Sequence, residues 1–143
     1  MRRYVVDASV AALWYFPEDR TESAEALLEV AKIELLAPDI LHLEMAVLAR
    51  ERVRRGEIDP GTAERILEAL RKAPIEAKSS ADLAQQALAL SLREGLGLYD
   101  AFYLTVAMQA GCPIVTADPR LHELLRSSPF AQHVLWIGDL SGP

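Results

Sequence analysis

The sequence predicts an α/β fold, with a mostly parallel sheet that helices cover on both faces. Short runs of β-branched and aromatic residues alternate with helical segments along the whole chain. The short runs are almost continuously apolar, as is typical of strands buried on both faces. Glycine, proline or an acid follows most runs and separates them from the next segment. Together these observations indicate βα units rather than an all-β or all-helical fold.

The five predicted strands are short and apolar, and turn-forming or acidic residues bound them. The first ends at Asp7, and Pro38 ends the second. Their expected ranges are 3–6, 33–37, 75–77, 114–116 and 134–137.

Seven helices are expected, and several carry a recognisable start signal. Ser9 is a plausible N-cap for the first helix, and Ser79 with Asp82 resembles a capping box. Asp59-Pro60 and Asp118-Pro119 place proline at the first helical position, where its missing N–H is harmless. The ranges are about 10–16, 22–32, 39–55, 60–73, 80–93, 98–110 and 119–126, with a break at Pro17-Glu18-Asp19.

Composition describes an ordinary globular chain. Its 143 residues are 51% hydrophobic and 25% charged, and we expect one domain over 1–143 with a substantial core. No apolar run approaches the roughly 20 residues that span a bilayer. The N-terminus reaches an acid too early for a signal peptide, and Cys112 is the sole cysteine, which excludes a disulfide framework. These features favour the cytoplasm.

The net charge of −6 argues against bulk electrostatic binding of nucleic acid, which normally needs a basic protein. An RNA or DNA substrate would require a local basic surface, or a cation that bridges carboxylates to phosphate.

Four acids occupy informative positions. Asp7 and Asp118 follow two predicted strands, and ligands of open parallel sheets lie at the carboxyl ends of strands. Glu44 shares a helix face with the aliphatic residues Ile40, Leu41, Val47 and Leu48, and Asp100 shares one with Tyr103, Leu104 and Ala107. A carboxylate buried among such side chains is costly without a partner.

Each acid also has a structural interpretation. Asp118 before Pro119 is a good N-cap, Asp100 favours the positive end of a helix dipole, and Asp7 could terminate its strand. Glu44 could pair with an arginine or tilt toward solvent. Taken singly, these interpretations are favoured over a ligand role. The joint arrangement favours a shared acidic pocket.

Four segments in this order resemble the PIN-domain family of metal-dependent ribonucleases, and most closely its VapC-type toxin branch. They are V-V-D-A-S-V, A-P-D-I-L-H-L-E-M-A-V-L, Y-D-A-F-Y-L-T-V-A and I-V-T-A-D. The resemblance implies a three-layer α/β/α fold with a five-stranded parallel sheet in order 3-2-1-4-5. It maps the acidic metal site onto Asp7, Glu44, Asp100 and Asp118, with support from Ser9 and Thr116. Ala8 departs from the threonine or serine that relatives often carry there.

This set suits phosphodiester hydrolysis. Close carboxylates repel one another unless a cation joins them, and Mg²⁺ or Mn²⁺ prefers such oxygen ligands. We therefore predict a Mg²⁺- or Mn²⁺-dependent endoribonuclease, with Asp7 and Asp100 as the best candidates for direct ligands. The resemblance implies 5′-phosphate and 3′-hydroxyl products. Candidate RNA contacts are Arg50, Arg54, Arg55 and Arg120, although a helix C-terminus explains the first three equally well.

Other function classes remain open. The chain lacks the aspartate at position 9 of a D-x-D phosphatase, and it has no lysine after Lys78 to serve a receiver domain. A non-catalytic binding module with the same fold, or a nuclease outside a toxin–antitoxin pair, remains an alternative.

The resemblance further implies a cognate antitoxin and a homodimer. Trp14, Tyr15, Phe16, Leu27 and Leu28 are apolar enough to line an antitoxin groove, although such residues more often form core.

Overall fold

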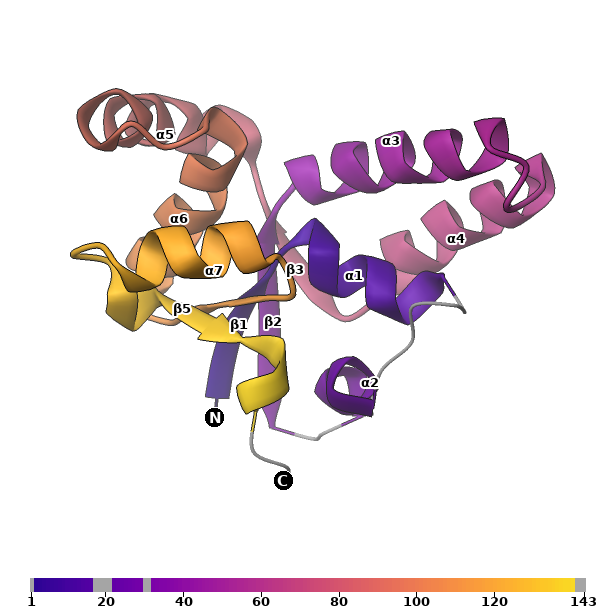
Figure 1. Ribbon diagram of the computed structural model, residues 1–143, viewed down its shortest axis with the longest axis horizontal. Helices are drawn as coiled ribbons and strands as arrows, with labels where there is room; N and C mark the ends of the chain where they lie inside the picture. The colour runs from indigo at the N-terminus through magenta and orange to yellow at the C-terminus, as the bar shows by residue number, and fades with distance from the viewer. Residues whose placement is uncertain (1, 17–21, 30–31, 141–143) are drawn as a thin grey trace.

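The computed structural model describes residues 2–16, 22–29 and 32–140 and contains a five-stranded parallel sheet (Figure 1). The strand order is β3-β2-β1-β4-β5, which confirms the order that the resemblance implied. β1 lies at the centre, between β2 and β4. The strands are β1 Arg2–Val6, β2 Ile33–Pro38, β3 Ile75–Lys78, β4 Ile114–Thr116 and β5 Val134–Trp136.

Helices cover both faces of the sheet, so the predicted three-layer α/β/α architecture is confirmed (Figure 1). The described residues form seven α-helices and two short 3₁₀ turns. These are α1 Ala8–Tyr15, α2 Glu22–Glu29, α3 Ile40–Arg54, α4 Pro60–Lys72, α5 Ser80–Glu94, α6 Leu98–Ala110, α7 Pro119–Arg126, η2 Ala131–His133 and η3 Ile137–Asp139.

Alternate residues of each central strand serve two separate cores. Val5 packs with α5, α6 and α7, whereas Val6 packs with the layer that contains α1 to α4. Ile114 and Val115 of β4 divide in the same way. Because side chains alternate across a strand, a sheet covered on both faces needs apolar residues at every position. This requirement explains the short, continuous apolar runs of the sequence.

The helix starts confirm some cap predictions and correct others. Asp59 and Asp118 cap α4 and α7, and each is followed by proline as predicted. The Ser9 prediction is wrong, because Asp7 is the N-cap of α1 and accepts from the amide of Val10. The capping box at Ser79 is also wrong: Ser79 caps α5 without a side-chain hydrogen bond.

The α3–α4 pair extends away from the sheet as a helical hairpin (Figure 1). Val47 and Leu48 of α3 are 61% and 38% exposed, whereas Leu41 is fully buried. Glu44 therefore lies at the edge of the buried face and not in the middle of an apolar face, which corrects the sequence interpretation.

Parts of the sequence predictions lie outside the described residues, namely the break at 17–19 and the end of the second helix at 30–31. Among the described helices, none has the length and apolarity needed to cross a membrane.

Candidate functional site

The site lies where β1 and β4 end side by side. Val6 is paired with Val115, so Asp7 after β1 lies beside Thr116, the last residue of β4. Asp118 follows two residues later and starts α7. The parallel pairing of neighbouring strands thus brings together residues more than 100 positions apart in the sequence.

Asp7 is held by donors from both strands. Its Oδ1 accepts from the Ser9 hydroxyl at 2.6 Å and from the Val10 amide at 3.1 Å, and its Oδ2 accepts from the Thr116 hydroxyl at 2.5 Å. The two hydroxyls in turn accept from the amides of Ala117 and Asp118. Each hydroxyl has one proton, and each gives it to Asp7. Ser9 and Thr116 therefore fix both the position and the rotamer of this carboxylate.

Asp7 is an acid in an unfavourable environment. Among the described residues, Asp7 is one of the few polar residues that are buried, and only 6% of its surface is exposed. Burial raises its pKa above the usual value, the charge of Asp118 adds to this effect, and the three hydrogen bonds oppose it. A carboxylate that is strongly fixed yet poorly solvated gains from a nearby cation.

Glu44 extends from α3 and hydrogen-bonds to Tyr103 on α6. Its Oε1 accepts a hydrogen bond of 2.8 Å from the Tyr103 hydroxyl on α6. Partial burial raises the pKa of Glu44, and the nearby charges of Asp7 and Asp100 raise it further, while the Tyr103 bond lowers it. Two structural interpretations of Glu44 were a pair with arginine and a tilt toward solvent. Within the described residues, Glu44 instead is partly buried and its hydrogen-bond partner is Tyr103.

Sequence reasoning missed the role of Tyr103, which it counted only as part of an apolar helix face. The residue is 2% exposed, and burial together with the charge of Glu44 raises the pKa of its phenol far above the usual value. The hydroxyl therefore remains a donor. A tyrosine among aliphatic residues on the helix that carries Asp100 was the available signal.

Asp100 and Asp118 share one cation of the chain itself. The Nη2 atom of Arg120 lies 3.0 Å from Oδ2 of Asp100 and 3.4 Å from Oδ2 of Asp118. The other carboxylate oxygen of Asp118 caps α7 by accepting from the Arg120 amide at 2.9 Å. Asp100 lies in the first turn of α6, where the helix dipole also favours a negative charge.

The four acids thus form a connected electrostatic group. The charge of Asp118 raises the pKa of Asp7, and the charges of Asp7 and Asp100 raise the pKa of Glu44. Arg120 forms ion pairs with both Asp100 and Asp118. Among the described residues, however, no three His, Cys, Asp or Glu side chains converge closely enough to enclose a metal ion. The donor chemistry fits Mg²⁺ or Mn²⁺, because both prefer oxygen ligands and Mg²⁺ keeps several waters instead of a full protein cage.

The candidate RNA-contact arginines occupy two places. Arg120 lies at the acids, whereas Arg54 and Arg55 lie about 15 Å along α3 from Glu44 at 1.5 Å per residue. Arg54 and Arg55 both pair with Glu51 and remain more than 60% exposed. Only Arg120 among these three is part of the acidic group.

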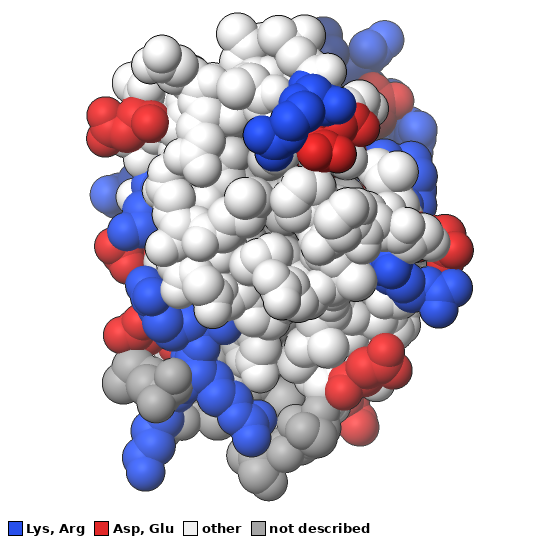
Figure 2. Space-filling view, turned by 90° about the vertical axis from the view of Figure 1, so that its left-hand side faces the viewer, with Lys and Arg blue, Asp and Glu red and all other residues white. Residues whose placement is uncertain are grey.

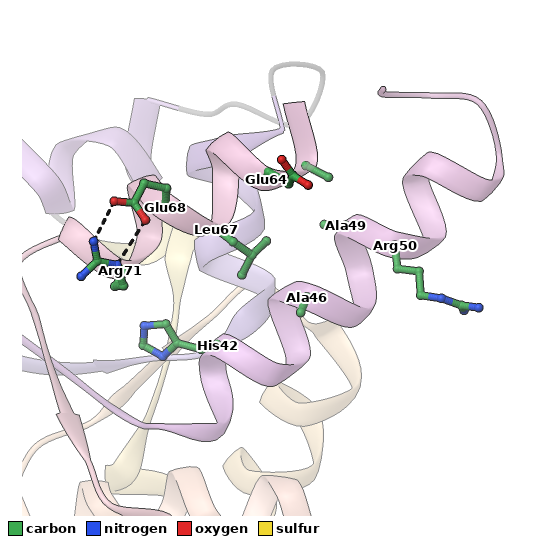
Figure 3. A pocket seen from close by; sticks show the side chains of 9 residues that line it. His42, Ala46, Ala49, Arg50, Glu64, Leu67, Glu68 and Arg71 are labelled. Carbon is green, nitrogen blue, oxygen red and sulfur yellow. Dashed lines mark hydrogen bonds and ion pairs between the residues drawn. The ribbon is translucent and has the colours of Figure 1, made fainter. Parts of the chain in front are cut away.

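A groove lies between α3 and α4, with a cavity volume of about 540 Å³ (Figure 3). Leu67 points into it, Ala46 and Ala49 form the α3 side, and Arg50 extends from α3 away from α4. The full lining is His42, Ala46, Ala49, Arg50, Ala63, Glu64, Leu67, Glu68 and Arg71.

This groove differs from the one expected from the sequence. Trp14, Phe16 and Leu27 are each at most 5% exposed, and Tyr15 and Leu28 pack against the same core. These residues form core, which the sequence favoured over a role in a groove, because α1 with its C-cap Phe16, and α2, use these side chains to cover the sheet.

Comparison with known proteins agrees with this fold. The model of the PIN domain family matches residues 4–126. The chain is 35% identical over 123 residues to Ribonuclease VapC3 of Pyrobaculum aerophilum, an alignment that covers 85% of this chain and 93% of the relative. The crystal structure of PAE2754 from the same organism has a TM-score of 0.67 at 24% identity over 96% of this chain and 85% of that one, a likeness of fold. The chain therefore belongs to the PIN-domain family, in its VapC-type branch.

Proposed function

We propose that this protein is a Mg²⁺- or Mn²⁺-dependent endoribonuclease and the toxin of a toxin–antitoxin pair. The observation that carries the proposal is the fixed, buried Asp7 carboxylate at the junction of β1 and β4, with Glu44, Asp100 and Asp118 within electrostatic reach. The relative named Ribonuclease VapC3 supports RNA as the substrate. Cleavage of cellular RNA would place the protein in the cytoplasm.

The contacts of each of the four acids suggest its role in catalysis. Asp7 and Asp100 are the proposed direct ligands, since three hydrogen bonds hold Asp7 in place and Asp100 already presents Oδ2 to a cation. Glu44 is oriented by Tyr103, and its raised pKa suits a group that exchanges a proton with an attacking water. Asp118 holds the start of α7 and adds negative charge at the pocket edge.

A bound divalent ion would supply the nucleophilic water and stabilise the charge that develops on phosphorus. The protein residues fix the carboxylates in place, so little reorganisation is needed when the phosphate arrives. The ion also explains how a chain of net charge −6 could bind a polyanion. Arg120, and more distantly Arg50, Arg54 and Arg55, would contact flanking phosphates.

Cleavage of a structured RNA tests the proposal. The wild-type protein should cut it with Mg²⁺ or Mn²⁺ and leave 5′-phosphate ends, and EDTA should stop the reaction. Asp7→Asn and Asp100→Asn should each lower the rate by about 100-fold or more, as expected for groups that act on transition-state charge. Asp59→Asn is the matched control, because asparagine caps a helix as well as aspartate and α4 starts at the far end of the α3–α4 hairpin (Figure 1).

Two outcomes would favour the alternatives. Equal rates for the wild type, Asp7→Asn and Asp100→Asn, or no cleavage by any of them, would favour a non-catalytic binding module. Cleavage without growth arrest on expression, and without neutralisation by a cognate partner, would favour a nuclease outside a toxin–antitoxin pair.

The α3–α4 groove is the proposed seat of the antitoxin. Ala46 and Ala49 lie within about two turns of Glu44 on the same helix, so an apolar segment bound there could extend toward the acids. Leu67→Glu should weaken neutralisation by the cognate antitoxin, measured as growth rescue on co-expression. Ala69→Glu, at an exposed α4 position that is not part of the groove lining, is the control.

A second surface is the proposed homodimer contact. Figure 2 shows a broad face with few charged residues on the side of α5 and α6. On α5, Ala84, Leu88 and Leu92 recur every four residues, and the two leucines are 50% and 76% exposed. An uncharged helical stripe of this kind is costly to leave in water and suits a second copy of the chain.

A further inference from the structure

Arg120 connects two elements of the acidic group that would otherwise repel each other. Asp100 is on α6 and Asp118 precedes α7, and the same Nη2 atom lies within 3.4 Å of a carboxylate oxygen on each. The Arg120 amide also donates to Asp118, so this residue contacts the aspartate through both its backbone and its side chain.

Exposure differs strongly across this ion pair. The side chains of Asp100 and Asp118 are 19% and 34% exposed, whereas that of Arg120 is 62% exposed. The guanidinium therefore covers the carboxylates from the solvent side while its long stem remains free to turn outward. An exposed pair of this kind contributes roughly 0–1 kcal/mol, so it exchanges readily for a stronger cation partner.

We propose that Arg120 is the resident counter-ion of the acidic pocket, which the divalent cation displaces and which then becomes a ligand for an RNA phosphate. The inference rests on the proposed function and deepens it. Oδ2 of Asp100 already accepts from Nη2, and a guanidinium this close would repel a divalent ion at the same carboxylate. Metal binding and the inward position of Arg120 therefore exclude each other.

The displaced side chain has a second use. An arginine fork matches the oxygens of a phosphate, and Arg120 is anchored by its own amide at Asp118. When the side chain turns outward it remains at the pocket rim, where the scissile phosphate must pass. One residue would thus offset part of the negative charge of the acidic group before the metal binds, and later add affinity for RNA.

Calorimetric titration with Mn²⁺ tests the exchange without any need for turnover. Arg120→Gln should bind Mn²⁺ about three- to tenfold more tightly than the wild type, since a competing positive charge is gone. Arg120→Lys keeps the charge and should return the affinity to near the wild-type value. Arg126→Gln on the same helix is the control, because Arg126 is 61% exposed and pairs with Glu123 instead of the pocket acids.

The same variants test the second proposed role of Arg120, binding of an RNA phosphate, separately from its role as a counter-ion. For RNA cleavage at saturating Mn²⁺, Arg120→Gln should raise KM about fivefold or more, with a smaller effect on kcat. Mn²⁺ affinity that is unchanged or weaker in Arg120→Gln, with a wild type that binds metal and cleaves RNA, would overturn the counter-ion role alone. A wild type that neither binds Mn²⁺ nor cleaves RNA would overturn the proposed function, and this inference with it.

Discussion

The Tyr103 hydroxyl donates a 2.8 Å hydrogen bond to Oε1 of Glu44 and so joins α6 to α3 across the acidic pocket. Tyr103 is almost fully buried and Glu44 is partly buried, so neither group is freely solvated. The bond gives the Glu44 carboxylate a fixed orientation. It also opposes the rise in the pKa of Glu44 that burial causes.

Removing this hydroxyl should affect both stability and the pH profile. Tyr103→Phe deletes a bond to a charged acceptor and should cost about 1.5–3 kcal/mol of unfolding free energy in urea. Because the bond lowers the pKa of Glu44, its loss should shift the acid limb of the cleavage–pH profile to higher pH. Tyr4→Phe, at the tyrosine in the middle of β1, should leave that limb in place. An unshifted limb in Tyr103→Phe would exclude this role for the bond.

Asp7 should lower the stability of the metal-free protein at neutral pH. Its folded pKa is raised above the usual value for an aspartate, chiefly by burial, so the ionised form is the disfavoured one. The cost is present above the folded pKa and disappears as the pH falls through it toward the unfolded value. Asp7→Asn should therefore raise the unfolding free energy at neutral pH in EDTA, with a smaller gain in acid.

Asp59 is the control, because folding shifts its pKa in the opposite direction to that of Asp7. The pKa of Asp59 is lowered, chiefly by its bond from the Thr62 amide, so its ionised form stabilises the fold above the unfolded pKa. Asp59→Asn should not gain stability at neutral pH. Urea unfolding of both variants at two pH values checks the pair, and a destabilised Asp7→Asn would contradict this account of Asp7.

Two buried threonines provide a matched test of the Asp7 support. Thr116 and Thr105 are both fully buried, but Thr116 donates to Asp7 and accepts from the Asp118 amide. Within the described residues, the Thr105 hydroxyl has no hydrogen-bond partner. Thr116→Val should cost about 1–3 kcal/mol, whereas Thr105→Val should be neutral or stabilising. Equal effects in thermal unfolding would show that the Thr116 bonds contribute nothing.

The uncharged α5 stripe should control the oligomeric state. Leu88→Glu and Leu92→Glu place a charge in the proposed homodimer contact and should give a monomer when the molar mass is measured by light scattering. Val47→Glu alters another exposed apolar residue, on α3, and should keep the wild-type mass. A wild type that is already monomeric at high concentration would refute the proposed contact.

The sequence predicted the central strands well because β1 and β4 present apolar residues to a core on each face of the sheet. Val5 and Val6 face opposite cores. Two consecutive apolar residues therefore indicated a strand buried on both faces and not one with a solvent-exposed face. Asp7 and Asp118 could be placed at one sheet edge because parallel strands present their carboxyl ends together. The order of the strands came from the family resemblance and not from periodicity.

What the sequence could not predict depends on contacts between elements. Tyr103 reaches Glu44 because α6 and α3 lie on either side of the pocket, a relation that no local pattern encodes. The N-cap of α1 is Asp7 and not the predicted Ser9, whose hydroxyl donates a hydrogen bond to Asp7 instead of capping the helix. Val47 continues the apolar pattern of α3 but is exposed, since periodicity does not distinguish a core face from a surface for a partner.

The central claim is that Asp7, Glu44, Asp100 and Asp118 belong to one cation site. Calorimetric titration with Mn²⁺ of the wild type and of Asp7→Asn, Glu44→Gln, Asp100→Asn and Asp118→Asn tests it most directly. We predict one site in the wild type, about tenfold or more weakened by Asp7→Asn and Asp100→Asn and also weakened by the other two. Wild-type affinity in Asp7→Asn and Asp100→Asn, or no binding by the wild type, would contradict the claim.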